Sequence, residues 1–233
     1  MNTDPIGKNI LFEDNHLIIY NKQPSQIVQG DKTGDTPLSD LLKEFIKERD
    51  HKPGNVFLGV VHRIDRPVSG VVIFAKTSKA LTRLNEMIKA GQIHKTYWAV
   101  VKNLPPEESG HLIHYLKKNE EKNKSFAYDK EISGSRKAEL TYRLIGRSQN
   151  YYLLEVILLT GRHHQIRTQL AKIGCPIKGD LKYGSERSNP DGSIHLHARQ
   201  VDFIHPVSKE AILVVADPPD DALWKSFLIQ SEK

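Results

Sequence analysis

Residues 62–76 read HRIDRPVSGVVIFAK, a charged loop that leads into an uninterrupted run of apolar and β-branched residues. Such a run predicts a buried β-strand, because β-branched side chains fit the pleated surface of a sheet. Asp65 therefore lies in a loop that enters a strand, with Arg63 and Arg66 close by on either side. Nearby cations favour the ionised form of a carboxylate, so Asp65 is a candidate base or nucleophile. A surface aspartate in a turn, or half of an ion pair, explains the same spacing.

The segments on both sides of this strand show alternating strand and helix patterns. Residues 9–25 contain two short apolar runs separated by the turn-forming sequence EDN, which predicts a β-hairpin. In residues 36–50, Pro37 suits a first helical position, and apolar residues follow with spacings of three and four. Residues 77–91 predict a second helix that begins at a Thr-Ser N-cap and stops at a glycine. Residues 95–102 predict the next strand.

The second half of the chain begins with a segment of different character. Residues 103–136 are dense in charge with little apolar periodicity, and we expect a variable, partly mobile excursion, either a hairpin or a loop. The pattern beyond it predicts paired strands at 137–146 and 151–159, a helix at 162–174, strands at 195–205 and 211–219, and an acid-capped helix at 220–230. Strands outnumber helices and several connections suit hairpins, so we expect an α+β fold with a largely antiparallel sheet.

The composition is that of a globular protein with a basic surface. The 233 residues include 34 Lys and Arg against 28 Asp and Glu, a net charge of +6, which favours an anionic partner such as nucleic acid. The single cysteine, Cys175, excludes an intramolecular disulfide and a thiolate metal cluster, and it fits a reducing compartment. Neither a leader pattern nor a run of about 18 apolar residues occurs, so we expect a soluble, cytoplasmic protein.

Other kinds of catalytic site have weaker support in the sequence. Histidines that could bind a metal together with Asp65 are His62, His163, His164, His195 and His197. Adjacent His163 and His164 would diverge by about 100° on the predicted helix, and no His-Glu-x-x-His pattern occurs. Ser69 lies in V-S-G rather than in a G-x-S-x-G elbow, which argues against a Ser-His-Asp triad. No glycine-rich phosphate loop occurs, so no nucleotide cofactor is expected.

Four segments occur in an order and at spacings that resemble the RluA family of pseudouridine synthases. These segments are HRIDRPVSG at 62–70, KTYWAVV at 95–101, TGRHHQIRTQLAKIGCPIKGDLKYG at 160–184 and LHAR at 196–199. The similarity runs from about residue 9 to residue 217. It implies one catalytic domain over residues 1–233 with two lobes around a central active-site cleft, and no preceding S4-like domain. It also implies a cofactor-independent isomerase that converts uridine in RNA to pseudouridine.

The resemblance assigns a role to each matching residue. In the family, the aspartate of the H-R-L-D motif is the essential catalytic residue, and Asp65 stands in that place. Tyr97 matches the tyrosine expected to stack on the target base and to assist removal of the C5 proton. Arg167 matches the arginine expected to pair with the catalytic aspartate. A bidentate guanidinium would both orient Asp65 and keep it charged.

Five further residues are candidates for substrate binding. Arg63 resembles the residue that holds the extruded nucleotide near the vacated base position. Leu196 is expected in the apolar wall of the pocket, and Lys22 is expected near a phosphate or the active site. His62 and Arg162, which lie inside the matching motifs, complete this group.

The chain departs from the family pattern at two places near the catalytic motif. Val68 stands where threonine is usual, and Gln23, Pro24 and Ser25 stand where Pro-Ala-Gly is common. These changes leave Asp65 in place but put the local loop geometry in doubt.

The predicted partner is ribosomal or transfer RNA, with no metal, no cofactor and no membrane, and a monomer is expected. The sequence leaves open whether the aspartate attacks ribose C1′ or removes the 2′ proton. A non-catalytic RNA-binding or RNA-folding module on the same basic surface is the alternative, and a metal-dependent hydrolase is a third hypothesis.

Overall fold

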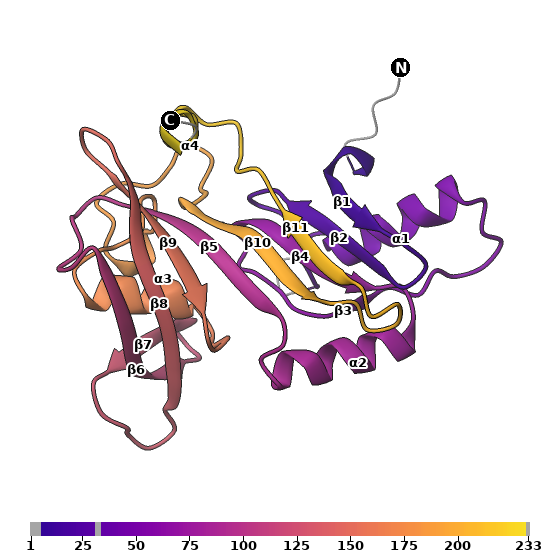
Figure 1. Ribbon diagram of the computed structural model, residues 1–233, viewed down its shortest axis with the longest axis horizontal. Helices are drawn as coiled ribbons and strands as arrows, with labels where there is room; N and C mark the ends of the chain where they lie inside the picture. The colour runs from indigo at the N-terminus through magenta and orange to yellow at the C-terminus, as the bar shows by residue number, and fades with distance from the viewer. Residues whose placement is uncertain (1–5, 31–33, 232–233) are drawn as a thin grey trace. The chain divides into compact units, whose positions relative to one another are not determined.

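The computed structural model describes residues 6–30 and 34–231, and the chain divides into two compact units. The first unit contains Met1–Ile93 and Ala198–Asp217, and the second contains His94–His197 and Pro218–Lys233. Figure 1 shows the elements of both units. The expectation that residues 1–233 act as one catalytic domain stays a prediction, and each unit is described by itself.

The first unit is built on a sheet whose neighbouring strands are β1 (Ile10–Glu13), β2 (Leu17–Lys22), β4 (Ser69–Ala75) and β10 (Leu196–Ile204). β3 (Gly59–Val60) pairs with β4, and β11 (Ala211–Val215) pairs with β10. β1 and β2 form the predicted antiparallel hairpin, and β2 also pairs antiparallel with β4. The predictions of β1, β2, β4, β10 and β11 are therefore confirmed, whereas the short strand β3 was not predicted.

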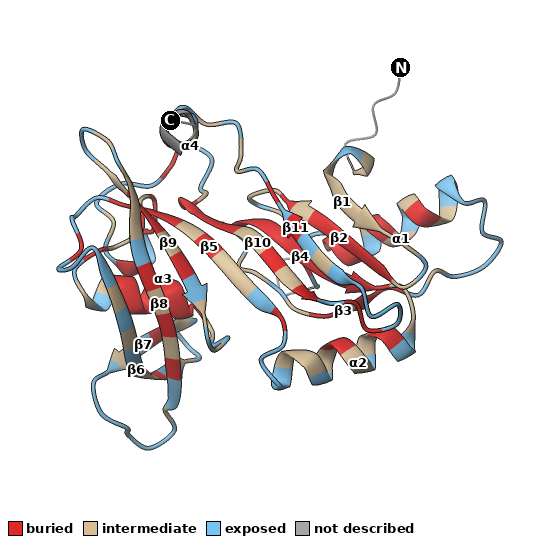
Figure 2. Cartoon of the chain, viewed as in Figure 1, coloured by how far each residue is buried: buried red, intermediate tan, exposed pale blue. Residues whose placement is uncertain are grey.

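Strand β4 is buried along its whole length, as the apolar run predicted (Figure 2). On one face, Val72 and Phe74 pack with Leu38, Leu42 and Ile46 of helix α1 (Leu38–Arg49). The alternate side chains of the strand are buried as well, which explains why the sequence shows a continuous apolar run rather than an alternating one.

Helix α2 (Ser78–Lys89) follows β4 and begins as the sequence predicted. The side chain of Thr77 accepts a hydrogen bond of 3.2 Å from the backbone N–H of Ala80, which satisfies one donor of the first turn. Gly91 follows the helix with φ +69°, a conformation that favours glycine. In α1, by contrast, Pro37 is the N-cap with extended backbone rather than the first helical residue, so the helix begins one residue later than predicted.

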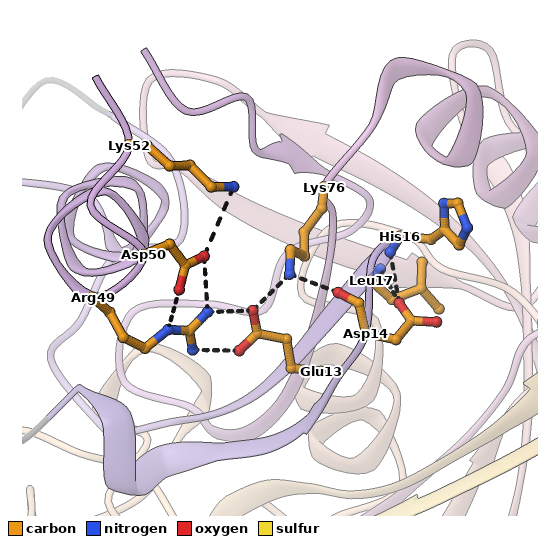
Figure 3. Close-up of polar contacts among 8 residues, drawn as sticks. All are labelled: Glu13, Asp14, His16, Leu17, Arg49, Asp50, Lys52 and Lys76. Carbon is orange, nitrogen blue, oxygen red and sulfur yellow. Dashed lines mark hydrogen bonds and ion pairs between the residues drawn. The ribbon is translucent and has the colours of Figure 1, made fainter. Parts of the chain in front are cut away.

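A network of charged side chains joins the ends of β1, α1 and β4 (Figure 3). The carboxylate of Glu13 accepts hydrogen bonds of 2.7 and 2.8 Å from the guanidinium of Arg49 and one of 2.6 Å from Lys76. Arg49 also donates to Asp50 at 2.8 Å. The hydrogen bonds from Arg49 hold the pKa of Glu13 below its usual value, against the opposing effect of burial. The network fixes the turn at which β4 passes into α2.

The second unit is an antiparallel sheet of five strands among the described residues. In spatial order they are β5 (His94–Val101), β9 (Tyr152–Leu158), β8 (Arg136–Arg147), β6 (Ser109–Asn119) and β7 (Lys124–Tyr128). The predicted pairing of β8 with β9 is confirmed. Residues 103–136, for which a hairpin and a loop were both open, contain the β6–β7 hairpin.

Helices α3 (Gln165–Lys172) and α4 (Ala222–Ser231) belong to the second unit. Gln169 of α3 is fully buried, and its amide donates to the carbonyls of Leu112 and Ala138 at 3.2 and 3.3 Å. Asp221 accepts hydrogen bonds from two backbone N–H groups at the start of α4, which confirms the predicted acid cap. No helix within residues 6–30 and 34–231 is both long and apolar enough to span a membrane.

Candidate active site

The loop that carries Asp65 connects β3 to β4 and is fixed by hydrogen bonds at both ends. The backbone N–H of Val61 donates to the carbonyl of Ile73 at 3.3 Å, and the N–H of Val68 donates to the carbonyl of Asp65 at 3.0 Å. The Nε2 atom of His62 accepts a 3.3 Å hydrogen bond from the N–H of Ile73. Because Nε2 accepts, the neutral ring carries its proton on Nδ1. His62 therefore anchors the loop to β4.

The side chain of Lys22 supports the same loop. Its side chain is fully buried, and Nζ donates to the carbonyls of Gln23 and Arg66 at 2.9 and 3.1 Å. Burial lowers the pKa of Lys22 to about 7, although the negative charge of Asp65 acts in the opposite direction. Of the two expected roles of Lys22, contact with a phosphate does not suit a buried ammonium group. A role near the active site suits it better and stays a prediction.

The two arginines that flank Asp65 in the sequence have different surroundings. Arg66 is exposed and its guanidinium forms an ion pair with Asp35. The sequence did not predict this partner of Arg66. Lys22 is a further basic group near the loop, and the negative charge of Asp65 favours its protonated form. Arg63 is exposed on the loop, as a residue that contacts substrate requires.

The departures from the family pattern have visible effects on the backbone. Ser25 adopts φ +71°, a left-handed conformation at the position where the family commonly has glycine. Its N–H donates to the carbonyl of Arg66 at 3.0 Å, so this strained residue also holds the loop that carries Asp65. Val68 is buried, and an apolar side chain suits that place.

Gly70 lies at the end of the loop that carries Asp65, and its position tolerates no side chain. Its φ is +112°, and a Cβ atom there would lie 2.3 Å from the carbonyl oxygen of Ala198 in β10. The glycine of the H-R-I-D-R-P-V-S-G motif is thus explained by the close approach of two strands.

Arg167 lies in α3 and is buried beside Asp180. Its Nε atom donates to Asp180 Oδ2 at 2.6 Å and Nη2 donates to Oδ1 at 2.8 Å, a bidentate ion pair. The guanidinium carbon also lies 5.0 Å from the ring centre of Tyr183. Sequence reasoning missed Asp180 and Tyr183, although both stand in the GDLKYG part of the quoted motif.

The hydroxyl of Tyr183 links the site to the β6–β7 hairpin. It accepts a 2.8 Å hydrogen bond from the N–H of Ser125 and lies 2.9 Å from Nδ1 of His164. Burial raises the pKa of Tyr183. The sequence argument that His163 and His164 diverge on a helix was wrong. Both precede α3, His164 is its N-cap with φ +52°, and the two rings stack at 3.7 Å.

The remaining predicted residues of the second unit differ in exposure. Tyr97 in β5 is buried opposite Val156 of β9, and Leu196 is buried at the start of β10. Arg162 is exposed, and its Nε atom donates to the carbonyl of Lys137 at 2.9 Å. Leu196 and Arg162 keep their predicted roles as proposals.

The structure groups the predicted site residues into two sets. In the first unit, one loop and the end of β2 bring together Lys22, His62, Arg63 and Asp65. The second unit contains Tyr97, Arg162, Arg167 and Leu196. Since the two sets belong to different units, the pairing of Asp65 with Arg167 and with Tyr97 stays a prediction.

Two other features of the described residues bear on the choice of site. Within residues 6–30 and 34–231, no group of three or more His, Cys, Asp and Glu side chains is arranged to hold a metal ion. A pocket of about 350 Å³ lies beside the Glu13 network, lined in part by Lys52, Phe57 and Lys76. It contains none of the predicted site residues, so it gives no support to them.

Comparison with known proteins places these motifs in a family. The chain matches the family described as RNA pseudouridylate synthase over residues 16–172. It is 34% identical over 218 residues to an uncharacterized RNA pseudouridine synthase of Synechocystis sp., covering 92% of this chain and 66% of that protein. It is also 34% identical over 226 residues to ribosomal large subunit pseudouridine synthase C of Buchnera aphidicola, covering 94% and 69%. The chain spans about two thirds of the length of these relatives.

The fold has a counterpart among solved structures. Human RNA pseudouridylate synthase domain containing 4 matches with a TM-score of 0.78 at 21% identity, covering 97% of this chain and 94% of that chain. The likeness confirms the predicted α+β fold with largely antiparallel strands.

Proposed function

The chain belongs to the RNA pseudouridylate synthase family, and from that premise we propose that it isomerises specific uridines of RNA to pseudouridine with Asp65 as the essential catalytic residue. The observation that carries the proposal is the position of Asp65 in the H-R-I-D motif, inside the matched region and on a loop anchored by the buried Lys22 and by His62. Enzymes of this family are isomerases, and the reaction needs no cofactor.

In the proposed mechanism, the target uridine is first extruded from its stack, because a stacked nucleotide hides its C1′ atom and ring face. Arg63, which is exposed, holds the extruded state, and Tyr97 stacks on the uracil ring. Asp65 then attacks C1′ or removes the 2′ proton, and the bond from C1′ to N1 breaks. The uracil rotates and a bond forms from C1′ to C5, while the carboxylate of Asp65 leaves C1′ in the first route or the proton returns to C2′ in the second. A base then removes the C5 proton, and N1 takes up a proton.

The buried ion pair gives Arg167 a defined orientation for this reaction. Asp180 engages Nε and Nη2 of the guanidinium. Following the family resemblance, we assign the same guanidinium to the carboxylate of Asp65 as well. A guanidinium bound by two carboxylates is held in one orientation, which suits the positioning of a catalytic group.

The proposed substrate is ribosomal or transfer RNA, in the cytoplasm, bound by a monomer. The net charge of +6 suits a polyanionic substrate. The Buchnera aphidicola relative is named as a ribosomal large subunit enzyme, which supports ribosomal RNA. Mapping pseudouridine in total RNA from cells with and without this protein would identify the position.

The direct test replaces Asp65 by asparagine, which keeps the shape and removes the charge. Asp65→Asn should bind RNA with wild-type affinity and form no pseudouridine, measured by carbodiimide labelling and primer extension. Asp35→Asn is the matched control, since Asp35 pairs with Arg66 on the exposed side of the loop and should leave turnover within a few-fold. Retained turnover in Asp65→Asn would refute the assignment. If the wild-type protein modifies no RNA, the non-catalytic RNA-binding module becomes the better account.

A further inference from the structure

The β6–β7 hairpin exposes aromatic side chains on one face. Phe126 and Tyr128 are 38% and 37% exposed. In the antiparallel register, Tyr128 lies opposite Tyr115 and Phe126 lies opposite Lys117. Residues two apart on a strand, and residues directly opposite on its partner, project from the same face of a sheet. The four side chains Tyr115, Lys117, Phe126 and Tyr128 therefore form one continuous surface, here called the hairpin face.

The fold itself places these rings on the outside. The alternate residues of the same two strands, His114, Leu116 and Ser125, are buried on the side that carries α3. The hairpin is thus well anchored, and its exposed aromatic residues are not the result of loose packing.

The hairpin face lies on the opposite side of the sheet from Tyr97. Tyr97 pairs with Val156, which in turn pairs with Tyr142 in β8. Lys137, the partner of Tyr115, is an odd number of residues from Tyr142 along the same strand and so projects from the other side. The hairpin face is therefore distinct from the surface expected to receive the target base.

Lysines surround the exposed rings. The ammonium group of Lys124 lies 5.7 Å from the ring centre of Phe126 and 5.0 Å from that of Tyr183. Lys117 is exposed within the face. Glu139 projects from the same side of the sheet and forms an ion pair of 2.6 Å with Lys137, so its charge is compensated. The hairpin face therefore combines flat apolar rings with positive charge.

We propose that the hairpin face binds a single-stranded segment of the RNA substrate outside the target nucleotide. Bases stack on Phe126, Tyr128 and Tyr115, and phosphates are neutralised by Lys117 and Lys124, because aromatic rings interleaved with lysines suit the alternating bases and phosphates of a single strand. An uncharged protein partner bound to the same face would not neutralise these two ammonium groups, whereas RNA phosphates would. The inference rests on the proposed function in one respect, that the substrate is RNA.

The test measures binding of a fluorescent single-stranded oligouridine to the purified full chain by anisotropy. The double variant Phe126→Ala/Tyr128→Ala should bind at least about tenfold more weakly, since each stacked ring contributes several-fold to affinity. Phe126→Trp should retain binding. Phe57→Ala is the matched control, because Phe57 is a 48% exposed aromatic residue of the other unit and should leave affinity unchanged. Circular dichroism checks that each variant is folded.

Charge is tested separately through the salt dependence of the same binding. Lys117→Gln should reduce the slope of log affinity against log salt by about 0.7, the value for one phosphate contact on a single strand. Unchanged affinity in the double variant, or an equal loss in Phe57→Ala, would overturn the inference. So would a double variant that binds RNA normally but loses self-association in sedimentation, because the face would then be a protein interface.

The outcomes separate this inference from the proposed function. Normal oligouridine binding by the hairpin variants, combined with loss of turnover in Asp65→Asn, would refute the role of the hairpin face and leave the proposed function intact. Failure of the wild-type chain to bind any RNA would overturn both proposals.

Discussion

Replacing Lys22 by methionine should make the stability of the protein depend less on pH in the alkaline range. Lys22 is fully buried, and burial lowers its pKa from 10.5 to about 7. An unfolded chain would hold the proton up to pH 10.5, so folding releases a proton at pH values between the two pKa values. The contribution of Lys22 to stability is complete above pH 10.5, falls as the pH is lowered through this window, and stops falling below pH 7.

The size of the effect follows from the two pKa values. Between pH 7 and pH 9 the free energy of unfolding of the wild type should rise by about 2 kcal/mol relative to that of Lys22→Met, since each pKa unit corresponds to about 1.4 kcal/mol. Titrations shared by both proteins cancel in the difference. Methionine has a similar length and no charge, so the main structural losses are the hydrogen bonds to the carbonyls of Gln23 and Arg66.

The assay is urea unfolding of wild type and variant at several pH values, followed by tryptophan fluorescence. The exposed Lys89 at the end of α2 provides the control, and Lys89→Met should leave the difference from wild type constant over the same range. A difference between wild type and Lys22→Met that stays flat from pH 7 to pH 9 would refute the reasoning, because Lys22 would then keep its proton in the folded chain.

Three further substitutions test the backbone and the buried ion pair. Ser25→Gly should raise the free energy of unfolding by about 1 kcal/mol in chemical denaturation, because it removes the side chain from a left-handed conformation. Gly70→Ala should destabilise the protein by several kcal/mol or prevent its soluble expression, since its Cβ would overlap the backbone of Ala198. Asp180→Asn should lower the free energy of unfolding by about 1.5–3 kcal/mol, because it removes the negative charge that holds the buried guanidinium of Arg167 through two hydrogen bonds; calorimetry that detects a loss below 1 kcal/mol would contradict this.

Local patterns in the sequence were sufficient for most elements of the fold. The strand at residues 69–75 was predicted because both of its faces are buried, which makes the run apolar throughout. The start of α2 was predicted because Thr77 caps it through a bond to Ala80, three residues away. The cap joins residues three positions apart, and the burial of the strand affects every residue in it. Both therefore leave a pattern in consecutive residues of the sequence.

The errors arose where the deciding contact joins distant residues. His164 ends the preceding loop with a left-handed backbone, and a helical pattern in the letters gives no sign of that. The ion pair of Arg66 with Asp35, thirty-one positions earlier, was likewise not predicted. Asp180 was quoted within a motif but received no role, because its partner Arg167 is thirteen residues away across a turn. Spacing along the chain cannot reveal such pairings.

In each unit, a charged side chain of the predicted site is oriented by a second residue that takes no part in the proposed bond changes. The loop of Asp65 is held by Lys22 and His62 through backbone atoms, and Arg167 is held by Asp180. Groups that are already oriented need little reorganisation when charge develops during the reaction. The free energy of orienting them is spent during folding instead. Changes at Lys22 or Asp180 should therefore lower turnover partially, because the proposed catalytic groups are then held less firmly. A change at Asp65 should abolish turnover, because it removes the proposed catalytic group. Partial activity in the first two and none in the third follows directly from that division.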